Sequence, residues 1–385
     1  MRSQIRVRLV ALPLLLAILP MSLDGAEGPG TPARRRSVRP PEHWHVPQCE
    51  VVRGIPAVTF SRDRGATVAE RSETLGGIGY TFGLAVLERP NQLMAVYENV
   101  VYRSEDAGCN WSAVAALDPS TFPPFLLAAP EGLLYAWSPN RQTLIRIERD
   151  RLMTLKSPAE SIVGLGVDAA GELRLGGSDG ALWKSTDSGS SWDPAGRLDP
   201  PGGWVYEFTF DPQNPDHILA ACAVSGAWTS EDGGRTWTEA SGLSKSGGSV
   251  NIFRGVISPA DPNRVWVEGI DLAESDAGAP SEGRHIYLSS DGGKTFTPVV
   301  DQSAGVVLVN GPVMAADPLN PDRLLFVFGT YYQQYGTDLF EYDAEAATLT
   351  THHFAFDGID SIAFSPVDPD TIYFGLEVVQ GIGEQ

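Results

Sequence analysis

A short motif recurs along the chain and limits what this sequence can fold into. Four segments share the pattern Ser-x-Asp-x-Gly-x-x-aromatic: RSEDAGCNW, STDSGSSW, TSEDGGRTW and SSDGGKTF. A catalytic constellation is normally unique, whereas a structural device recurs wherever the same unit is built. We therefore interpret the motif as a turn and not as an active site.

Each copy of the motif supplies the same residue types at the same spacing. The positions are Ser104, Asp106, Gly108 and Trp111; Ser185, Asp187, Gly189 and Trp192; Ser230, Asp232, Gly234 and Trp237; and Ser289, Asp291, Gly293 and Phe296. A weaker copy, SRDRGATV, has Ser61, Asp63 and Gly65 but ends in Val68. Ser and Asp side chains hydrogen-bond the backbone of a turn, and Gly adopts positive φ without strain. We expect each copy to form a hairpin turn held by its own side chains.

The motif resembles the Asp-box, or BNR, repeat. Proteins with this repeat include sialidases, family-74 xyloglucanases, the sortilin-type receptor domain and the photosystem II assembly factor. The resemblance implies a β-propeller in which the boxes lie on the outer part of the blades, away from the ligand face. It therefore predicts architecture and says little about chemistry.

The spacing of the motifs predicts the number of blades. Their aspartates fall at positions 63, 106, 187, 232 and 291, and the gap from 106 to 187 has room for two units. The extra unit is APEGLLYAWSPNRQTLIRIERDRLMTL, which has two readable strands but no box, and DLFEYDAEAATL belongs to a further unit without a box. We expect an all-β fold: a single seven-bladed propeller of four-stranded antiparallel blades.

A second repeated element supports this division of the chain into units. FDPQNPDHILA, ISPADPNRVWV, ADPLNPDRLLF and FSPVDPDTIYF each join a strand to a Pro-containing turn and an apolar strand. The last of these begins a unit that the C-terminus does not complete, and the first box has no such element before it. We expect residues 361–376 to supply two inner strands and residues 55–72 two outer strands of one blade. Pairing of N- and C-terminal strands would then close the ring and remove open sheet edges.

Charge excludes one large class of partners. The net charge is -20, from 28 Lys and Arg against 48 Asp and Glu, and only four of the basic residues are lysines. Binding to phosphate backbones depends on clustered Lys and Arg. We expect no nucleic-acid partner.

The first 45 residues read as export and linker segments. Residues 1–26 combine early arginines with an apolar run that is short for a membrane span, which predicts a secretory signal peptide. The alternative is an uncleaved N-terminal anchor. Residues 27–45 form a leader rich in Pro and Arg, and residues 46–385 form the propeller. We expect a secreted or periplasmic monomer without a membrane span in the mature chain.

Three cysteines, Cys49, Cys109 and Cys222, cannot all pair within one chain. In an oxidising compartment we prefer the bridge between Cys49 and Cys109, because both flank box segments whereas Cys222 lies in the apolar strand ILAACAV. No residue spacing predicts a zinc site. We expect neither a metal nor a cofactor.

Two long loops are the main candidates for ligand binding. If boxes occupy turns between the third and fourth strands, the loops between second and third strands lie on the opposite face. Two adjacent units have long loops there, and long loops on rigid scaffolds often carry function. The candidate ligand residues are Asp271, Glu274 and Asp276 in the first loop and Tyr331, Tyr332, Gln333, Gln334 and Tyr335 in the second. The alternative is a solvated acidic loop beside an aromatic loop that packs on the rim.

Glu207 and Arg254 form a second candidate site. They occupy the same position in consecutive inner strands, so we expect them to meet at the channel wall. A structural ion pair that holds neighbouring blades together is the interpretation favoured over a ligand-binding pair.

The enzyme families that share the repeat do not match residue by residue. RGIPAV at 53–58 differs from the Arg-Ile-Pro motif of sialidases because Gly54 separates Arg53 from Ile55. The xyloglucanases need two catalytic aspartates on facing blades, and no pair can be assigned here. We expect a secreted module that binds a protein or glycan without catalysis. The alternative is an extracellular glycoside hydrolase, sialidase-like or xyloglucanase-like.

Overall fold

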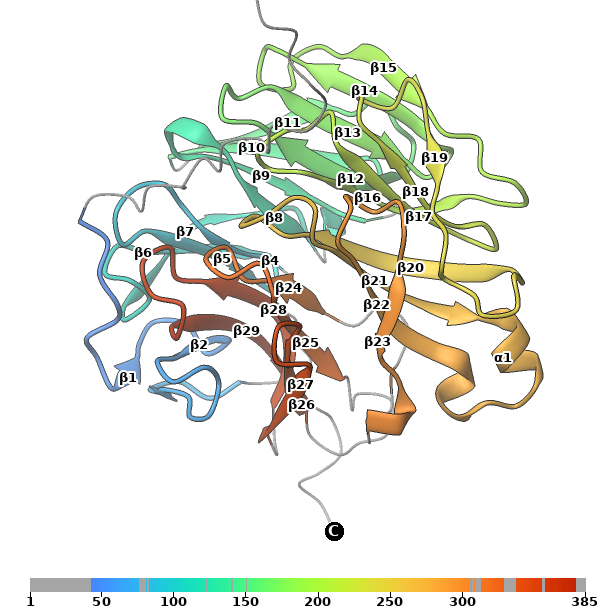
Figure 1. Ribbon diagram of the computed structural model, residues 1–385. Helices are drawn as coiled ribbons and strands as arrows, with labels where there is room; N and C mark the ends of the chain where they lie inside the picture. The colour runs from blue at the N-terminus through green and yellow to red at the C-terminus, as the bar shows by residue number, and fades with distance from the viewer. Residues whose placement is uncertain are drawn as a thin grey trace, which may run out of the picture. The chain divides into compact units, whose positions relative to one another are not determined.

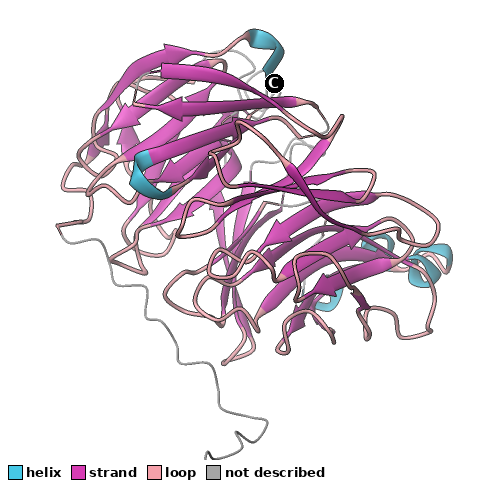
Figure 2. Cartoon of the chain, turned by 90° about the horizontal axis from the view of Figure 1, so that it is seen from above, coloured by secondary structure: helices cyan, strands magenta, loops and turns pink. Residues whose placement is uncertain are grey.

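The computed structural model describes residues 43–75, 81, 83–121, 124–139, 141–149, 151–304, 306, 308, 313–328, 337–354 and 357–378. All of these belong to one compact unit, Ser37–Gln385. The predicted signal peptide, most of the predicted leader and the five loop residues from Tyr331 to Tyr335 lie outside the described residues. Strands dominate this unit, and the helical segments are short (Figure 2).

Six antiparallel sheets of four strands form blades 1 to 6 (Figure 1). Blade 1 has β4 (Gly83–Val86), β5 (Leu93–Tyr97), β6 (Val100–Ser104) and β7 (Trp111–Ala116). Blade 2 has β8 (Phe125–Ala128), β9 (Leu133–Trp137), β10 (Thr143–Glu148) and β11 (Arg151–Lys156). Blade 3 has β12 (Ile162–Val167), β13 (Leu173–Gly177), β14 (Ala181–Ser185) and β15 (Asp193–Arg197).

The next three blades repeat this order. Blade 4 has β16 (Val205–Phe210), β17 (Ile218–Cys222), β18 (Gly226–Ser230) and β19 (Thr238–Glu239). Blade 5 has β20 (Val250–Ile257), β21 (Val265–Asp271), β22 (Arg284–Ser289) and β23 (Thr297–Val300), with α1 (Leu272–Asp276) and the 3-10 turn η3 (Pro280–Gly283) between its second and third strands. Blade 6 has β24 (Met314–Ala316), β25 (Arg323–Phe328), β26 (Thr337–Asp343) and β27 (Thr348–Phe354).

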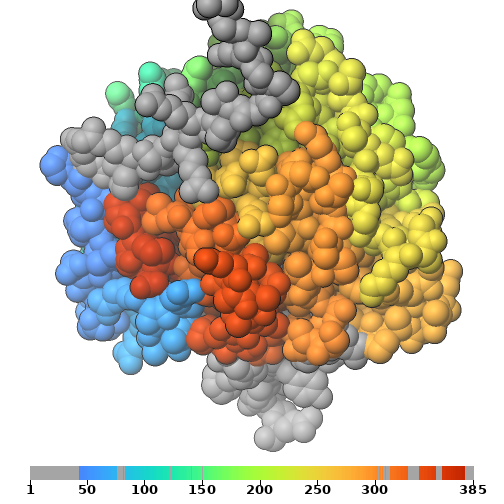
Figure 3. Space-filling model, in the orientation of Figure 1, coloured from blue at the N-terminus to red at the C-terminus, as the bar shows by residue number. Residues whose placement is uncertain are grey.

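Blade 7 is built from both ends of the described chain. Its strand order is β28 (Asp357–Phe364), β29 (Ile372–Val378) and β2 (Val58–Ser61), and β2 pairs antiparallel with β29. Figure 3 shows the blue N-terminal and red C-terminal residues side by side. The innermost strands contact one another in the cycle β4, β8, β12, β16, β20, β24, β28 and back to β4. The predicted seven-bladed propeller is therefore confirmed.

The outer edge of blade 7 differs from the expected fourth strand. β3 (Glu70–Arg71) follows the first box, but it pairs parallel with β1 (Val51–Val52) in a separate two-stranded sheet. The segment after β1 then reaches blade 1, because Arg53 N donates to Cys109 O at 2.9 Å and Trp111 N donates to Arg53 O at 2.8 Å. Ser241, in the connection between blades 4 and 5, makes the same two backbone bonds to blade 5. Ser241 N donates to Lys294 O, and Phe296 N donates to Ser241 O. The N-terminal segment thus acts at this edge as an inter-blade connection.

The core is divided among the blade interfaces. Seven buried apolar clusters are found in the described part of the chain, and each lies between two neighbouring blades. Trp44, placed in the leader by its sequence, is buried in the cluster between blades 7 and 1. Each blade therefore buries its faces only against its neighbours, as expected for this architecture.

The five Ser-x-Asp-x-Gly turns share one hydrogen-bond pattern, and each turn follows the third strand of its blade. In blade 4, Ser230 Oγ donates to Asp232 Oδ1 at 2.9 Å and accepts from Gly234 N at 2.9 Å, while Thr236 N and Oγ1 donate to the two Asp232 oxygens. The other four turns repeat these bonds. These bonds lower the pKa of the Asp232 carboxyl to about 2. The Ser and Asp side chains of the motif thus form hydrogen bonds within their own turns.

The boxes and the Pro-containing turns lie on the same face. Gly233 N in the blade 4 box donates to Asp216 O in the first turn of that blade, and Gly292 N donates to Asn263 O in blade 5. We call this side the turn face. The loop face is the opposite side, with the turns between second and third strands and the connections between blades.

Candidate functional site

The acidic loop of blade 5 does not gather its three candidate carboxylates into one site. Asp271 is buried at the N-terminus of α1, where its side chain accepts bonds from Ala273 N and Glu274 N. Asp276 is exposed at the other end of α1. No group of three or more His, Cys, Asp or Glu side chains that could hold a metal ion is found among the described residues. Asp271 therefore serves as a helix cap here.

Glu274 contacts a histidine that the sequence analysis did not select. His285 is buried on β22, and its Nε2 lies 2.7 Å from Glu274 Oε2. Its Nδ1 lies 4.0 Å from Asp301 Oδ2, and Lys245 Nζ lies 3.6 Å from Glu274 Oε1. This polar cluster holds α1 against blade 5. The sequence offered no signal for it, because its four members come from four different elements or connections.

Glu207 and Arg254 meet as their shared strand position predicts. Arg254 Nε lies 3.7 Å from Glu207 Oε1, and Glu207 Oε2 accepts from Gly255 N at 3.0 Å. Burial raises the pKa of the Glu207 carboxyl, and Arg254 opposes that rise. The Arg254 guanidinium also lies 6.0 Å from the ring centroid of Phe125 in blade 2. Arg254 thus contacts both its neighbouring blade and a strand across the ring.

Aromatic side chains continue from this pair to the loop face. Tyr206 and Phe253 have ring centroids 5.2 Å apart, and Trp204 lies 6.1 Å from Tyr206. Trp204, in the connection between blades 3 and 4, is 57% exposed, although large apolar side chains are usually buried. Isolated exposed tryptophans of this kind are common in protein interfaces.

A strained apolar turn lies beside Trp204. Val224, between β17 and β18, has φ 64° and is 42% exposed. A β-branched residue in this backbone region is an outlier, and such strain concentrates at functional sites. Ala223 N, next to Val224, donates to Trp204 O at 3.2 Å, so the two apolar residues are held near each other.

Val224 also lines a cavity between blades 4 and 5. Its volume is about 500 Å³, and its apolar walls include Pro201, Leu243 and Val250. Ser225, Glu239 and the serine- and glycine-rich connection after β19 supply the polar part of the lining. A hollow with both apolar and polar walls beside an exposed Trp is suited to an extended peptide or a projecting side chain.

A buried pair of carboxyl groups lies on the inner strands of blade 7. Asp360 is at a β-bulge in β28, and Glu377 is on the neighbouring β29. Burial and the adjacent carboxylate raise the pKa of Asp360 to about 8, while burial raises the pKa of Glu377 to about 7. Thr81 N donates to Asp360 Oδ2 at 2.9 Å. The two carboxyls hydrogen-bond each other, which leaves no space for a glycosidic bond between them.

The preferred disulfide is present, joining Cys49 to Cys109 in the box of blade 1. It fastens the N-terminal segment to the blade that this segment already contacts through Arg53. Cys222 is a free, buried thiol, and burial raises its pKa to about 12. Such a thiol is unreactive at neutral pH.

Comparison with solved structures identifies the fold. The chain matches a GH74 enzyme from Niastella koreensis with a TM-score of 0.54 and 18% identity, over 80% of this chain and 54% of that one. It therefore spans about half the length of that enzyme. It matches YCF48 bound to D1 peptide (TM-score 0.50, 17% identity, 86% and 88% coverage) and virginiamycin B lyase from Staphylococcus aureus (0.53, 12%, 78% and 95%). At these identities the likeness concerns the fold alone.

No protein-family model matches the sequence. Within the described residues, none of the helices is both long and apolar enough to span a membrane. Over 341 residues, however, the chain is 45% identical to the dispase autolysis-inducing protein of Streptomyces mobaraensis, and the match covers 88% of this chain and 91% of that protein. At that identity and coverage, the chain belongs to the family of the dispase autolysis-inducing protein.

Proposed function

We propose that this protein is a secreted, non-catalytic binding module that engages a protease and promotes the protease's self-cleavage. The observation that carries the proposal is the 45% identity to a protein named for inducing autolysis of dispase. Autolysis uses the active site of the protease itself. The propeller then needs to supply only a binding surface that favours cleavage of one protease molecule by another, or of an exposed protease loop.

The loop face of blades 4 and 5 is the binding surface that we favour. Trp204 and Val224 expose apolar area there, and the cavity of about 500 Å³ adjoins Val224. Interfaces concentrate their binding energy in a few aromatic anchors surrounded by weaker contacts. We propose that Trp204 is such an anchor and that the cavity receives an apolar side chain of the protease.

Secretion agrees with the disulfide. The bond between Cys49 and Cys109 is of the kind that persists in oxidising compartments. The segment 1–26, predicted to be a signal peptide, would direct the chain there.

The alternative is a glycoside hydrolase, and the buried carboxyl pair of blade 7 does not support it. Asp360 and Glu377 are both buried and bonded to each other, whereas glycosidases separate their two carboxyls by about 5 to 9.5 Å around the scissile bond. Binding of a glycan without hydrolysis remains part of the ligand-binding prediction for Tyr331 and its neighbours.

The test is to incubate purified dispase with and without this protein and to follow intact protease and its fragments over time. We expect the wild type to accelerate loss of the intact band, and Trp204→Ser to weaken binding about tenfold or more. Leu319→Ser is the matched control, because Leu319 is also an exposed apolar residue (39%) but lies on the turn face.

Unchanged autolysis and no measurable binding would contradict the proposal. Hydrolysis of chromogenic glycosides by the purified protein would favour the enzyme alternative. Equal losses from Trp204→Ser and Leu319→Ser would move the binding surface away from blades 4 and 5.

A further inference from the structure

Blade 2 lacks a box, and its outer turn is much smaller than those of its neighbours. Glu148 on β10 pairs with Arg151 on β11, so only two positions of the sequence separate the paired residues. In blade 1, Ser104 pairs with Trp111, and residues 105–110 lie between them. A box fills space on the turn face that the blade 2 hairpin leaves open.

The open space is a cavity of about 250 Å³ shared by three blades. Arg89 comes from the first turn of blade 1, Arg146 and Arg149 come from blade 2, and Ser188 comes from the box of blade 3. Gly132, in the first turn of blade 2, has φ 75°, and a Cβ at this position would lie 2.8 Å from Arg89 Nε. Arg89 therefore lies close to the wall of the cavity.

Arg146 is not paired with a carboxylate by any described contact. One of its terminal nitrogens lies 3.4 Å from Ser188 O and the other 3.3 Å from the thioether of Met153, while Nε is buried without a hydrogen-bond partner. A thioether is a weak acceptor. Half-buried guanidinium groups normally bind carboxylates or phosphates, often through two parallel bonds.

Other interior arginines of the turn face are paired. Arg174 in blade 3 binds Glu172 and Asp216, and Arg323 in blade 6 binds Asp317 and Glu341. Arg146 is the exception in this comparison. The difference is notable in a chain whose net charge is -20, since carboxylates are abundant.

Two carboxylates also line the cavity, and they limit its positive charge. Glu131 and Glu148 are both exposed, and no described ion pair joins either of them to the three arginines. Glu131 is further held by its backbone, because its N donates to Glu88 Oε2 at 3.3 Å. The formal charge of the lining is therefore +1, with the least satisfied cation, Arg146, furthest from solvent.

We propose that this cavity binds an anionic oxygen group, a carboxylate, through Arg146 on its inner wall and Arg89 and Arg149 at its mouth. The carboxylate belongs either to a small free acid or to an Asp or Glu side chain of a polypeptide. The site lies on the turn face, away from the surface proposed for the protease, and its test does not involve a protease.

The experiment measures binding of two probes at low ionic strength: succinate, by chemical-shift changes, and a fluorescein-labelled hexaglutamate peptide, by anisotropy. Hexaglutamine labelled in the same way is the uncharged control. We expect Arg149→Gln and Arg146→Gln each to weaken binding about tenfold, because each removes a charged hydrogen-bond donor. Arg235→Gln, which removes one exposed charge from the blade 4 box, should bind as the wild type does. Arg149 is exposed, so its variant tests the site without risk to the core.

Binding of both probes identifies a free carboxylate as ligand, and binding of hexaglutamate alone identifies acidic side chains. Either result supports the site if Arg146→Gln and Arg149→Gln weaken it. The absence of binding by both probes, or equal binding by the wild type, Arg149→Gln and Arg235→Gln, overturns the proposal.

Discussion

Blades 2 and 6 both lack a box, and they use charged side chains at the same sheet positions in opposite ways. Glu341 in blade 6 lies opposite Leu325 on the second strand, as Arg146 in blade 2 lies opposite Tyr135. The residue after the box aspartate of the next blade is Arg64 in one case and Ser188 in the other. In blade 6 the carboxylate of Glu341 therefore binds the guanidinium of Arg64, whereas in blade 2 the guanidinium of Arg146 meets only the backbone carbonyl of Ser188 at this position.

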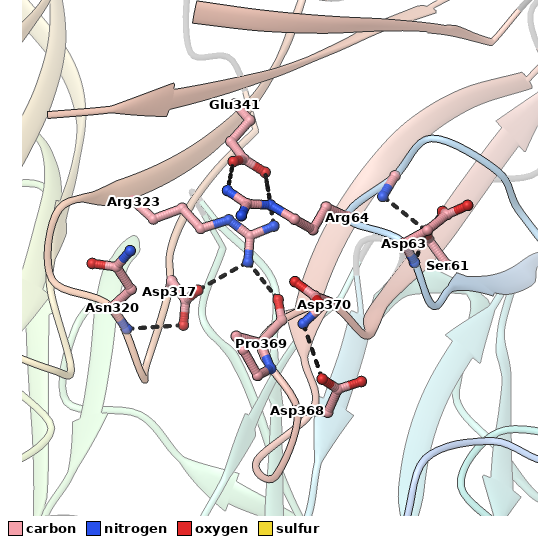
Figure 4. A network of polar contacts seen from close by, with 11 residues as sticks. Ser61, Asp63, Arg64, Asp317, Asn320, Arg323, Glu341, Asp368, Pro369 and Asp370 are labelled. Atoms are coloured by element: carbon pink, nitrogen blue, oxygen red, sulfur yellow. Dashed lines mark hydrogen bonds and ion pairs between the residues drawn. The ribbon is translucent and has the colours of Figure 1, made fainter. Parts of the chain in front are cut away.

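The charges of blade 6 form a closed network (Figure 4). Arg323, which is 2% exposed, binds Asp317 Oδ2 at 3.0 Å and Glu341 Oε2 at 2.8 Å. It also donates to Pro369 O in blade 7, and Arg64 from the blade 7 box completes the shell of Glu341. This network joins blades 6 and 7. Its paired charges fill the space on the turn face that a box turn fills in other blades.

The difference shows that loss of a box has two outcomes in a ring. The space can be filled by a neutralised ion network, which contributes to stability, or it can stay open with an unneutralised cation, which makes it available to a ligand. A buried charge costs free energy unless it is paired, so the two outcomes predict different responses to mutation.

The largest effect is expected from Arg323→Met. This change leaves Asp317 buried without a cationic partner and leaves Glu341 with Arg64 alone, and we expect the free energy of unfolding to fall by about 3–5 kcal/mol in denaturant titrations. Arg146→Met removes a cation that has no carboxylate partner among the described residues, so its effect should stay within about 1 kcal/mol. Equal losses from the two variants would break the comparison.

The buried carboxyl groups of Asp360 and Glu377 in blade 7 differ from both cases. They are stabilised by protonation and not by pairing with a cation. The pKa of Asp360, about 8, lies above the usual value of about 3.9 in unfolded chains. The folded state thus holds more protons, so this stabilising contribution is complete below about pH 4 and is lost as pH rises through about 8. Between pH 5 and 8 we expect the wild type to lose about 2–4 kcal/mol more than Asp360→Asn. Parallel pH profiles of unfolding would contradict this.

Substitution at the last residue of the third strand should lower stability in a blade with a box and should have little effect in a blade without one. Ser230→Ala removes a buried hydroxyl that accepts from two backbone N–H groups, Asp232 and Gly234, and we expect a loss of about 1–2 kcal/mol. Glu148 occupies the equivalent strand position in blade 2 but is exposed, so Glu148→Ala should change stability by less than about 0.5 kcal/mol. Melting curves of both variants measure the contrast. A neutral Ser230→Ala would show that the box is not a stabilising turn.

Much of the fold was predictable because its signals are local and repeated. The Ser-x-Asp-x-Gly turns bond to themselves, so five residues suffice to recognise each one. The Pro-containing turns of Asp211 and Asp317 then set the strand order within each blade. The partner of β3 was not predictable in this way, because β1 contains only two residues.

The candidate sites were less accessible to prediction because their members come from different blades. Glu207 and Arg254 could be identified only because each lies at the same position before a copy of the repeated Pro-containing element. In the sequence Arg146 resembles any other charged residue of an alternating strand. Its lack of a carboxylate partner becomes visible only in the structure, where it meets the backbone of Ser188 from another blade. Glu377 had a usable signal, since it is the one acid in the strand sequence IYFGLEV, whereas Asp360 shares its strand with Asp357 and Ser361. The loop residues from Tyr331 to Tyr335 lie outside the described residues and stay a prediction.

The smallest expected effect comes from transplanting the blade 6 pairing into blade 2. Arg146→Glu alone puts a second acid near Glu148, and Ser188→Arg alone puts a second guanidinium near Arg146, so each single change should destabilise slightly. The double variant reproduces the pairing of Glu341 with Arg64, and Ser188 (φ 57°) and Arg64 (φ 62°) have the same backbone conformation. We expect a favourable coupling of about 0.5–1 kcal/mol in a double-mutant cycle, modest because Arg64 itself is half exposed. The same double variant should no longer bind hexaglutamate, since the cavity would then hold its own carboxylate. Additive effects of the two changes would mean that blades 2 and 6 differ in more than these two side chains.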